Sequence, residues 1–351
     1  MEVAPVSELV TVTSYGRAAG SARVRVFDWL DWLELDARSA TYMGGSSNAP
    51  SSLQRHPKEV AVAETGLRRL RSEMRGRRLL LSRQASPLSS GALERDLLAA
   101  ASLGVYDFDD ALYLPTASLT GRLFPKERIW RRAVEAADTV IAGNSVLADQ
   151  ASQLNRNTVV IPSCVNPNEY RMKTDFHLSE TPRAIWIGSP STERFLQAIS
   201  AELLHAHRTH GLRLTIVSAG EAPLGALDAM VDRVGWDIGT FANVLASADF
   251  GVMPLPDDPW SRGKCAYKLL QYGASGLPMI GSPVGANREV LSLCEGLAPE
   301  TESDWVDVLE TVINESATAR AARGVAGRRA IEAHYSFRAW QGEWCRAMDV
   351  E

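Results

Sequence analysis

Two lysines in the second half of the chain stand where they could bind an anion. Lys264 and Lys268 are four positions apart, directly after Gly263, in a chain with only five lysines beside 32 arginines. We expect a helix that opens near Gly263, and residues four apart on a helix share one face, here near the positive end of its dipole. Two ammonium groups in that position repel each other unless an anion lies between them. The pair therefore predicts a phosphate site, with a solvated surface as the alternative.

Three aspartates follow an apolar, strand-like run in the first half of the chain. Asp107, Asp109 and Asp110 place three carboxylates within four residues, which is costly unless they are solvated, paired or used. Alternation along a strand should send Asp107 and Asp109 to one side, with Asp110 just past the strand end. A Mn²⁺ or Mg²⁺ clamp needs further oxygen ligands that the sequence does not place. A phosphoaspartyl nucleophile and a helix cap are further alternatives, and we favour contacts of Asp109 and Asp110 to substrate hydroxyls.

Two turns that contain glycine also follow strand-like runs. One spans residues 15–21 and includes Gly20, and the other places Gly188 and Ser189 just before a predicted helix. Glycine lets backbone N–H groups approach a ligand closely, and the start of a helix favours an anion. Neither turn has the G-x-G-x-x-G spacing of a dinucleotide site. For the first turn, an anion site and a tight turn without a ligand are both open, and for the second, a phosphate site and a helix cap are both open.

The elements that must position these residues alternate between short strands and longer helices. Such alternation is typical of parallel sheets built from right-handed β-α-β units. The expected strands are residues 9–14, 38–42, 79–82, 103–108, 139–142, 158–161, 184–187, 212–217, 250–253 and 279–282. The expected helices include residues 22–33, 57–75, 93–101, 128–137, 193–208 and 264–273.

The pattern restarts after a polar segment without periodicity, residues 163–182, which we interpret as an interdomain linker. The sequence therefore predicts an α/β protein with two doubly wound domains. In open parallel sheets, ligands bind beyond the carboxyl ends of the strands, which is where the candidate residues stand.

Composition restricts the class of protein further. The 351 residues are 45% hydrophobic and 23% charged, with a net charge of −5, which is ordinary for a globular chain and excludes a disordered or fibrous one. No apolar run is long enough to span a bilayer, and the first residues do not resemble a signal peptide. Four widely spaced cysteines predict a reduced, cytoplasmic protein, and the acidic balance argues against nucleic acid as a partner.

One basic stretch departs from this balance. Residues Arg68–Arg78 contain six arginines and one glutamate. Such a run is either a solvated face or a patch for anionic lipid or a polyanionic acceptor. We retain peripheral membrane contact through this stretch as a possible partner interaction.

Several of these motifs together resemble a known family. The run GKCAYKLLQYGASGLPMIGSPVGANREV (263–290), with WIGSPST, YDFDDALY, GNSVLAD and VIPSCVNPNEY, is similar to retaining GT-B glycosyltransferases of family four (group one). The resemblance implies two Rossmann-like domains that face a cleft. It assigns residues 1–165 to an acceptor domain, 180–333 to a nucleotide-sugar donor domain, and 334–351 to a C-terminal helix that packs back on the N-terminal domain.

The resemblance also assigns roles to individual residues of the second half. Lys264 and Lys268 would bind the donor diphosphate, with Arg194 as a third cation. The family has two glutamates eight positions apart, and here Gln271 and Gly263 occupy those positions. Gln271 can still bind a ribose hydroxyl, and the first role passes to Asp257 or Asp258. Expected donor contacts are therefore Gly20, Gly188, Ser189, Arg194, Asp257, Lys264, Lys268, Gln271, Asn287 and Glu289.

The expected reaction is hexosyl transfer, with retention, from a nucleoside-diphosphate sugar to a hydroxyl of a small molecule or glycan. Lysines aimed at the leaving diphosphate stabilise the transition state more than the ground state. A leaving phosphate oxygen can accept the acceptor's proton, so neither a metal nor another cofactor is expected. Asp109, Asp110, Lys264 and Lys268 are the expected catalytic residues. A UDP-sugar comes first among UDP, GDP and TDP donors, and an arginine-rich composition suggests a bacterial source.

Two other functions stay open at this point. One is a nucleotide-sugar epimerase of the same fold, which would need an acid/base set at the sugar ring. The other is a non-catalytic nucleotide-binding partner of another transferase, which the missing glutamates would permit. The sequence names neither the acceptor nor the oligomeric state.

Overall fold

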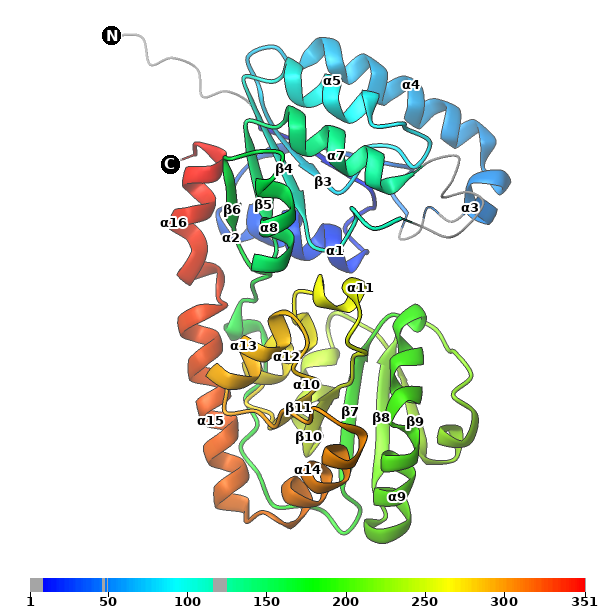
Figure 1. Ribbon diagram of the computed structural model, residues 1–351, viewed down its shortest axis with the longest axis vertical. Helices are drawn as coiled ribbons and strands as arrows, with labels where there is room; N and C mark the ends of the chain where they lie inside the picture. Colours follow the sequence, from blue (N-terminus) through cyan, green and yellow to red (C-terminus); the bar gives the residue numbers. More distant parts are fainter. Residues whose placement is uncertain (1–8, 46–47, 49, 116–124, 351) are drawn as a thin grey trace. The chain divides into compact units, whose positions relative to one another are not determined.

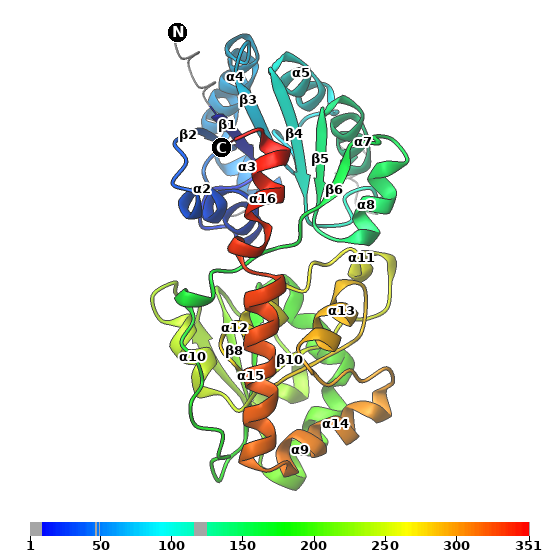
Figure 2. The same cartoon turned by 90° about the vertical axis from the view of Figure 1, so that its left-hand side faces the viewer.

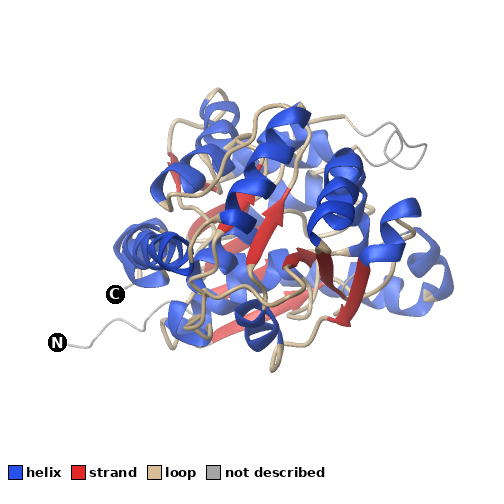
Figure 3. Cartoon of the chain, turned by 90° about the horizontal axis from the view of Figure 1, so that it is seen from below, coloured by secondary structure: helices blue, strands red, loops and turns tan. Residues whose placement is uncertain are grey.

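The computed structural model describes residues 9–45, 48, 50–115 and 125–350, and the chain forms two compact units (Figure 1). The first unit comprises Met1–Ser163 and Trp340–Glu351, and the second comprises Cys164–Ala339. Each unit has one parallel sheet with helices on both faces, and Figure 3 shows the strands in red among the blue helices. The predicted α/β class with two doubly wound domains is confirmed.

The first unit is built on a six-stranded parallel sheet in the order β2-β1-β3-β4-β5-β6. The interior strands β1, β3, β4 and β5 are apolar runs buried on both faces, as is typical of parallel sheets, whereas the edge strands β2 and β6 are partly exposed. The predicted strands of this half are all present, with ends shifted by one residue in places. Their bounds are β1 Leu9–Thr13, β2 Ala37–Thr41, β3 Arg78–Ser82, β4 Leu103–Phe108, β5 Thr139–Ala142 and β6 Thr158–Val160.

Helices cover both faces of this sheet. One face carries α2 (Asp28–Trp32) and α16 (Phe337–Met348), which lie side by side in Figure 2. The rings of Trp29 and Trp344 stack with centroids 5.3 Å apart, and Trp32 Nε1 donates to Gln341 Oε1 at 3.2 Å. The last residues of the chain thus belong to the first unit. The other helices are α3 Pro50–Arg55, α4 Pro57–Glu73, α5 Ala92–Ala100, α7 Lys126–Ala136 and α8 Ser145–Ser152.

The helix predicted over residues 22–33 is interrupted by a wider turn. Between α1 (Gly20–Ala22) and α2, residues Arg23–Phe27 form a π-helix, η1. The apolar periodicity of this stretch is compatible with either geometry, so the sequence did not distinguish them. π-Helical turns often occur where a side chain must be aimed at a particular partner, and this one contains the buried Arg25.

The second unit has a five-stranded parallel sheet in the order β11-β10-β7-β8-β9. The strand β9, Val231–Gly235, was not predicted. It is a half-exposed edge strand that contains aspartate and arginine, so it lacks the apolar run by which the other strands were recognised. The remaining strands are β7 Arg183–Gly188, β8 Arg213–Ser218, β10 Phe250–Met253 and β11 Met279–Gly281.

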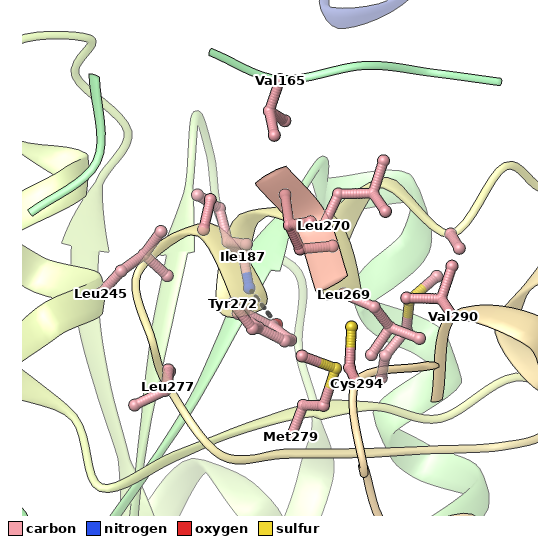
Figure 4. Close-up of a cluster of buried hydrophobic side chains, with 14 of the residues drawn as sticks. Val165, Ile187, Leu245, Leu269, Leu270, Tyr272, Leu277, Met279, Val290 and Cys294 are labelled. Atoms are coloured by element: carbon pink, nitrogen blue, oxygen red, sulfur yellow. Dashed lines mark hydrogen bonds between the residues drawn. The ribbon is translucent and has the colours of Figure 1, made fainter. Parts of the chain in front are cut away.

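Side chains alternate between two cores on the faces of this sheet. Trp186 and Ile216 face one core, together with the apolar residues of α9 and α14, whereas Ile187 and Val217 face the other, with α10, α12 and α13 (Figure 4). The helices of the unit are η2 Pro167–Glu169, η3 Pro190–Ile199, α9 Ser200–His210, η4 Gly225–Met230, α10 Phe241–Ser247, α11 Pro259–Arg262, α12 Tyr267–Ala274, α13 Ala286–Leu293, α14 Glu302–Asn314 and α15 Ala317–His334.

The segment interpreted as a linker is largely a packed part of the second unit. The backbone N–H of Lys173 donates to the carbonyl of Ser275 at 2.8 Å. The buried Arg320 donates through Nε to the carbonyl of Phe176 at 3.0 Å and through Nη1 to the carbonyl of Val312 at 3.1 Å. These contacts hold residues 164–182 against helices of the second unit. The polarity and lack of periodicity of this segment therefore did not reflect an unpacked connection between domains.

Candidate functional site

The helix expected to carry both lysines begins later than predicted. The short helix α11 ends at Arg262, and Ala266, directly before the next helix, has a φ of 54° in the left-handed region. Helix α12 begins at Tyr267, so Lys264 lies between two helices and Lys268 lies in the first turn of α12. The prediction that the two lysines share one helix face is therefore wrong. The turn at Ala266 breaks the periodicity that the argument assumed.

Lys268 nevertheless lies at the strand end where the sequence placed an anion. Its Nζ is 5.0 Å from the ring centroid of Trp186. A Cβ built on Gly188, the last residue of β7, would lie 2.9 Å from Lys268 Cε and 2.5 Å from the Trp186 ring. Glycine is required at this position because any side chain would collide. The structure thus brings Lys268 and Gly188 together, as the sequence had grouped them.

Tyr272 fixes the helix that carries Lys268 to the sheet. Its hydroxyl donates to the carbonyl of Val252 at 3.1 Å and accepts from the N–H of Ile187 at 3.3 Å, the dashed contact in Figure 4. Burial raises the pKa of Tyr272 above its ordinary value, so the hydroxyl keeps its proton. Helix α12 is thereby anchored through its second turn to both β7 and β10.

Of the other predicted cations and hydroxyls, Lys264 is half-buried like Lys268, whereas Ser189 and Arg194 are exposed. Lys264 Nζ lies 5.1 Å from the centroid of the Trp260 ring. Ser189 precedes η3 and is exposed, with its Oγ 3.0 Å from that of Ser191. Arg194 is exposed within η3, with its guanidinium 5.3 Å from the Phe195 ring centroid.

The loop between β10 and α11 holds both candidate aspartates in defined contacts. Asp257 accepts from Arg262 through Nε at 2.6 Å and Nη2 at 3.0 Å, and these hydrogen bonds lower the pKa of the Asp257 carboxyl. Asp258 caps α11, since its Oδ1 accepts from the N–H of Ser261 at 2.7 Å. Of the two, Asp257 is the exposed one and Asp258 is committed to the helix start.

The remaining donor residues predicted from the resemblance lie on α12 and α13. Gln271 is 4% exposed. Asn287 is fully buried and donates through Nδ2 to the carbonyl of Ser282 at 3.1 Å, so it holds the turn before α13. Gly285 in that turn has a φ of 55°, and a Cβ there would collide with the carbonyl of Arg262. Glu289 is exposed. The sugar contacts of Asn287 and Glu289 stay predictions.

In the first unit, an arginine that the sequence did not reveal joins two of the aspartates. Arg83 Nη1 donates to Asp109 Oδ1 at 2.6 Å and to Asp110 Oδ2 at 2.8 Å. Its φ of 67° is left-handed, and the Tyr106 hydroxyl donates to its carbonyl at 2.8 Å. Burial alone would lower the pKa of the guanidinium, but the two carboxylates outweigh burial and raise it. The cluster lies at the carboxyl ends of β3 and β4.

Asp107 takes a different partner. It is buried and accepts from Arg25 through Nε at 3.1 Å and Nη2 at 2.5 Å, while Arg25 Nη1 also donates to the carbonyl of Ile161 at 2.9 Å. Strand β4 ends at Phe108, so the expected alternation does not extend to Asp109. Asp109 and Asp110 both contact Arg83, whereas Asp107 contacts Arg25. The expectation that Asp107 and Asp109 lie on one side of the strand is therefore corrected.

The crowded glycine after β1 is not the predicted one. Gly20 is exposed, and a Cβ there would meet no atom within 4 Å. A Cβ on Gly16 would collide with the carbonyl of Gly44, and the Gly16 N–H donates to the carbonyl of Gly45 at 2.8 Å. The close backbone approach in this turn therefore depends on Gly16. The contact of Gly20 with the donor stays a prediction.

Within the described ranges, no group of three or more His, Cys, Asp or Glu side chains is arranged to hold a metal ion. No helix in the described part of the chain is long and apolar enough to cross a bilayer. The basic stretch Arg68–Arg78 begins in the last turns of α4, which ends at Glu73. Arg68 and Arg69 on the helix and Arg75 after it are exposed, and Arg71 pairs with Asp96 at 3.1 Å.

The second unit matches a known family in sequence. Residues 182–315 match the sequence profile of the family Glycosyl transferases group 1. This segment contains every predicted donor residue except Gly20. No curated protein matches the chain. The resemblance to group one glycosyltransferases is therefore confirmed for the second unit.

Solved structures are similar over nearly the whole chain. Sucrose-phosphate synthase from Thermosynechococcus elongatus superposes with a TM-score of 0.70 at 15% identity, over 97% of this chain and 98% of that one. HepE of Anabaena in complex with UDP and glucose gives 0.71 at 13% identity, over 98% and 100%. WaaG, a glycosyltransferase involved in lipopolysaccharide biosynthesis, gives 0.68 at 12% identity, over 97% and 99%. The predicted GT-B fold is confirmed.

Proposed function

We propose that this chain is a glycosyltransferase that moves a hexosyl group from a nucleoside-diphosphate sugar, a UDP-sugar first, to a hydroxyl acceptor. The observation that carries the proposal is the strand end of β7, where Gly188 leaves room for the ammonium-bearing side chain of Lys268. This strand end lies within the segment that matches Glycosyl transferases group 1. The similar HepE structure contains UDP and glucose, which supports UDP as the first nucleotide to test.

The chemistry follows from the charges at this strand end. Breaking the sugar–phosphate bond develops negative charge on the departing diphosphate, and a fixed cation there stabilises the transition state. Lys268 also stands in the first turn of α12, whose dipole acts with the same sign. With the positive charge supplied by the chain, we propose that transfer needs no metal. We further propose retention, with a leaving phosphate oxygen accepting the acceptor's proton.

The acceptor side of the proposal rests on the first unit. Asp109 and Asp110 stand at the carboxyl end of β4 and are held by Arg83, where parallel sheets place ligands. We propose that they orient hydroxyls of a small-molecule or glycan acceptor. The exposed arginines of the stretch Arg68–Arg78 support a peripheral contact with anionic lipid.

The location and source of the protein are also proposals. None of the four cysteines forms a disulfide, which supports the expectation of a reducing, cytoplasmic compartment. The arginine-rich composition supports a bacterial source.

The test is incubation with a panel of UDP-, GDP- and TDP-hexoses, followed by measurement of released nucleoside diphosphate. Slow donor hydrolysis without acceptor, equal in the presence of EDTA and of Mn²⁺, is the expected result. Activity that disappears with EDTA and returns with Mn²⁺ would contradict metal independence. Once an acceptor is found, the anomeric proton coupling in the product decides between retention and inversion.

One alternative has an observation in its favour. Gln271 and Gly263 occupy the two positions that the resemblance assigns to glutamates, which is compatible with a nucleotide-binding partner that does not turn over. That alternative would be supported if the chain binds nucleotide but releases no nucleoside diphosphate from any nucleotide sugar in the panel. A new sugar isomer in place of free nucleotide would support an epimerase.

A further inference from the structure

A buried serine stands beside the proposed phosphate site without a partner for its hydroxyl. Ser218 is the last residue of β8 and is 5% exposed. Its Oγ has no hydrogen-bond partner among the described residues. Buried polar groups are normally paired, because an unpaired hydroxyl loses its hydrogen bonds to water without replacement. Because ligands of open parallel sheets bind at the carboxyl ends of the strands, an unpaired hydroxyl at such an end indicates a group that the protein itself does not supply.

The register of the sheet places this hydroxyl next to Lys268. Ser218 on β8 pairs directly with Gly188 on β7. Partners in parallel register point their side chains to the same face. The pair two residues earlier, Trp186 and Ile216, therefore lies on the same face as Gly188 and Ser218, and both of its members belong to one core. The Ser218 side chain therefore projects to the same face as the Cβ that Gly188 lacks, a position 2.9 Å from Lys268 Cε. A hydroxyl and an ammonium-bearing side chain thus meet at neighbouring strand ends.

The chain on either side of the hydroxyl is held in place. The carbonyl of Ser218 accepts from the N–H of Trp236 at 3.0 Å. In the loop that follows, the Ala222 N–H donates to Glu193 Oε2 at 3.2 Å, and the carbonyl of Ala222 accepts from Arg233 Nη2 at 2.6 Å. Arg233 Nη1 also donates to Glu193 Oε2 at 2.9 Å. This network fixes the loop against the first turn of η3, so the hydroxyl is presented in a preformed position.

We propose that the Ser218 hydroxyl donates a hydrogen bond to a phosphate oxygen of the nucleoside diphosphate, beside Lys268. The inference rests on the proposed function and adds a donor contact to it. An anionic oxygen satisfies both groups at once, because it accepts from the hydroxyl and attracts the ammonium. An amine would be repelled by Lys268, and an apolar group would leave the hydroxyl unpaired. The phosphate is therefore the part of the donor that fits this position.

The test compares Ser218→Ala with a matched control, Ser275→Ala. Ser275 is also fully buried with an unpartnered Oγ, but it lies where α12 ends, before β11. Calorimetric titration of both variants with UDP, UMP and uridine measures the affinities, with GDP and TDP series included. Ser218→Ala should weaken UDP binding about tenfold and leave uridine binding unchanged. Ser275→Ala should bind both like the parent protein, and thermal unfolding should show that neither variant is destabilised.

Each other outcome overturns a specific statement. Parent-like UDP affinity in Ser218→Ala, while the parent binds UDP, overturns this inference alone. An equal loss for UDP and uridine overturns the phosphate assignment, because the hydroxyl would then contact the nucleoside. A parent protein that binds none of UDP, GDP or TDP overturns the proposed function and this inference together.

Discussion

Replacement of Arg83 by methionine should destabilise the first unit, and the loss should depend on pH. The guanidinium of Arg83 lies 2.6 Å from Asp109 and 2.8 Å from Asp110, and the three side chains are only 14–16% exposed. Without it, two half-buried carboxylates share one space without the cation that contacts both, although Lys126 still attracts Asp110. Methionine has similar length and is subject to the same left-handed backbone strain as arginine, so the change isolates the charge.

The magnitude follows from the burial of the cluster. Removing one partner of a buried ion pair costs about 3–5 kcal/mol, and the residual exposure of these groups favours the lower end, about 3 kcal/mol. In the variant, mutual repulsion and burial favour the neutral form of the carboxyls in the folded state. A carboxyl whose folded pKa is raised lowers stability above that pKa and has no effect below the unfolded one. The loss should therefore be largest near pH 7 and shrink toward about pH 4.

Urea unfolding at pH 7 and pH 4 measures this difference, with tryptophan fluorescence as the readout. The control is Arg68→Met, which removes an exposed arginine of α4 and should change stability little at either pH. A variant with Asp109→Asn and Asp110→Asn added to Arg83→Met should recover most of the loss at pH 7. A loss that is equal at the two pH values, or no greater than that of the control, would refute the electrostatic account of the cluster.

Three other predictions test the donor site, the acceptor site and a buried acid. Lys268→Ala or Lys264→Ala should lower kcat by about 10²–10³, by analogy with a lost oxyanion donor, and parent-like turnover in both variants would contradict the diphosphate assignment. Asp109→Asn or Asp110→Asn should lower turnover and leave nucleotide affinity unchanged in titrations, because both residues belong to the first unit, whereas loss of nucleotide binding would place that strand end wrongly. Burial raises the pKa of Glu94, so its ionisation lowers stability as pH rises above the unfolded value of about 4.3. Glu94→Gln should therefore gain urea stability relative to the parent protein from pH 4 to pH 7, and a constant difference would count against this.

The strands of the two sheets, and the strand ends at which the candidate site residues lie, could be predicted because a short stretch of sequence is enough to indicate each of them. A buried parallel strand is a short apolar run that ends in a turn, and Trp186–Gly188 has this pattern. Strand β9 lacked the pattern because it is partly exposed and contains an aspartate and an arginine. Local patterns thus predicted the other strands, including the edge strands β2, β6 and β11, and missed β9.

The start of α12 could not be predicted, because it is decided by residues distant in sequence. Alanine favours helices, yet Ala266 adopts a left-handed conformation and ends the continuity from Gly263. The chain there is restricted by the turn before α13, where Gly285 passes against the carbonyl of Arg262. The sequence around Lys264 gives no indication that Gly285 contacts the carbonyl of Arg262.

Arg25 and Arg83 were missed for a related reason. Arg25 and Asp107 are separated by 82 positions, and Arg83 and Asp109 by 26. The crowding of three carboxylates did indicate that compensating charge must exist somewhere. Because the chain has 32 arginines, the need for a compensating charge does not identify which arginine supplies it. The fold decides this, by bringing Arg25 and Arg83 next to the aspartates.

In the proposed donor site, Gly263 stands where the resemblance places the first glutamate, and the structure restricts which nearby carboxylate can replace that glutamate. Asp258 is committed to capping α11, and Gly263 has no side chain. Asp257 is held by Arg262, but both side chains are more than half exposed, at 60% and 54%. Exposed ion pairs contribute little to stability because water solvates the separated charges almost as well. A donor hydroxyl can therefore take the place of Arg262 on the Asp257 carboxylate at small cost, which makes Asp257 the residue in this loop best able to contact the sugar.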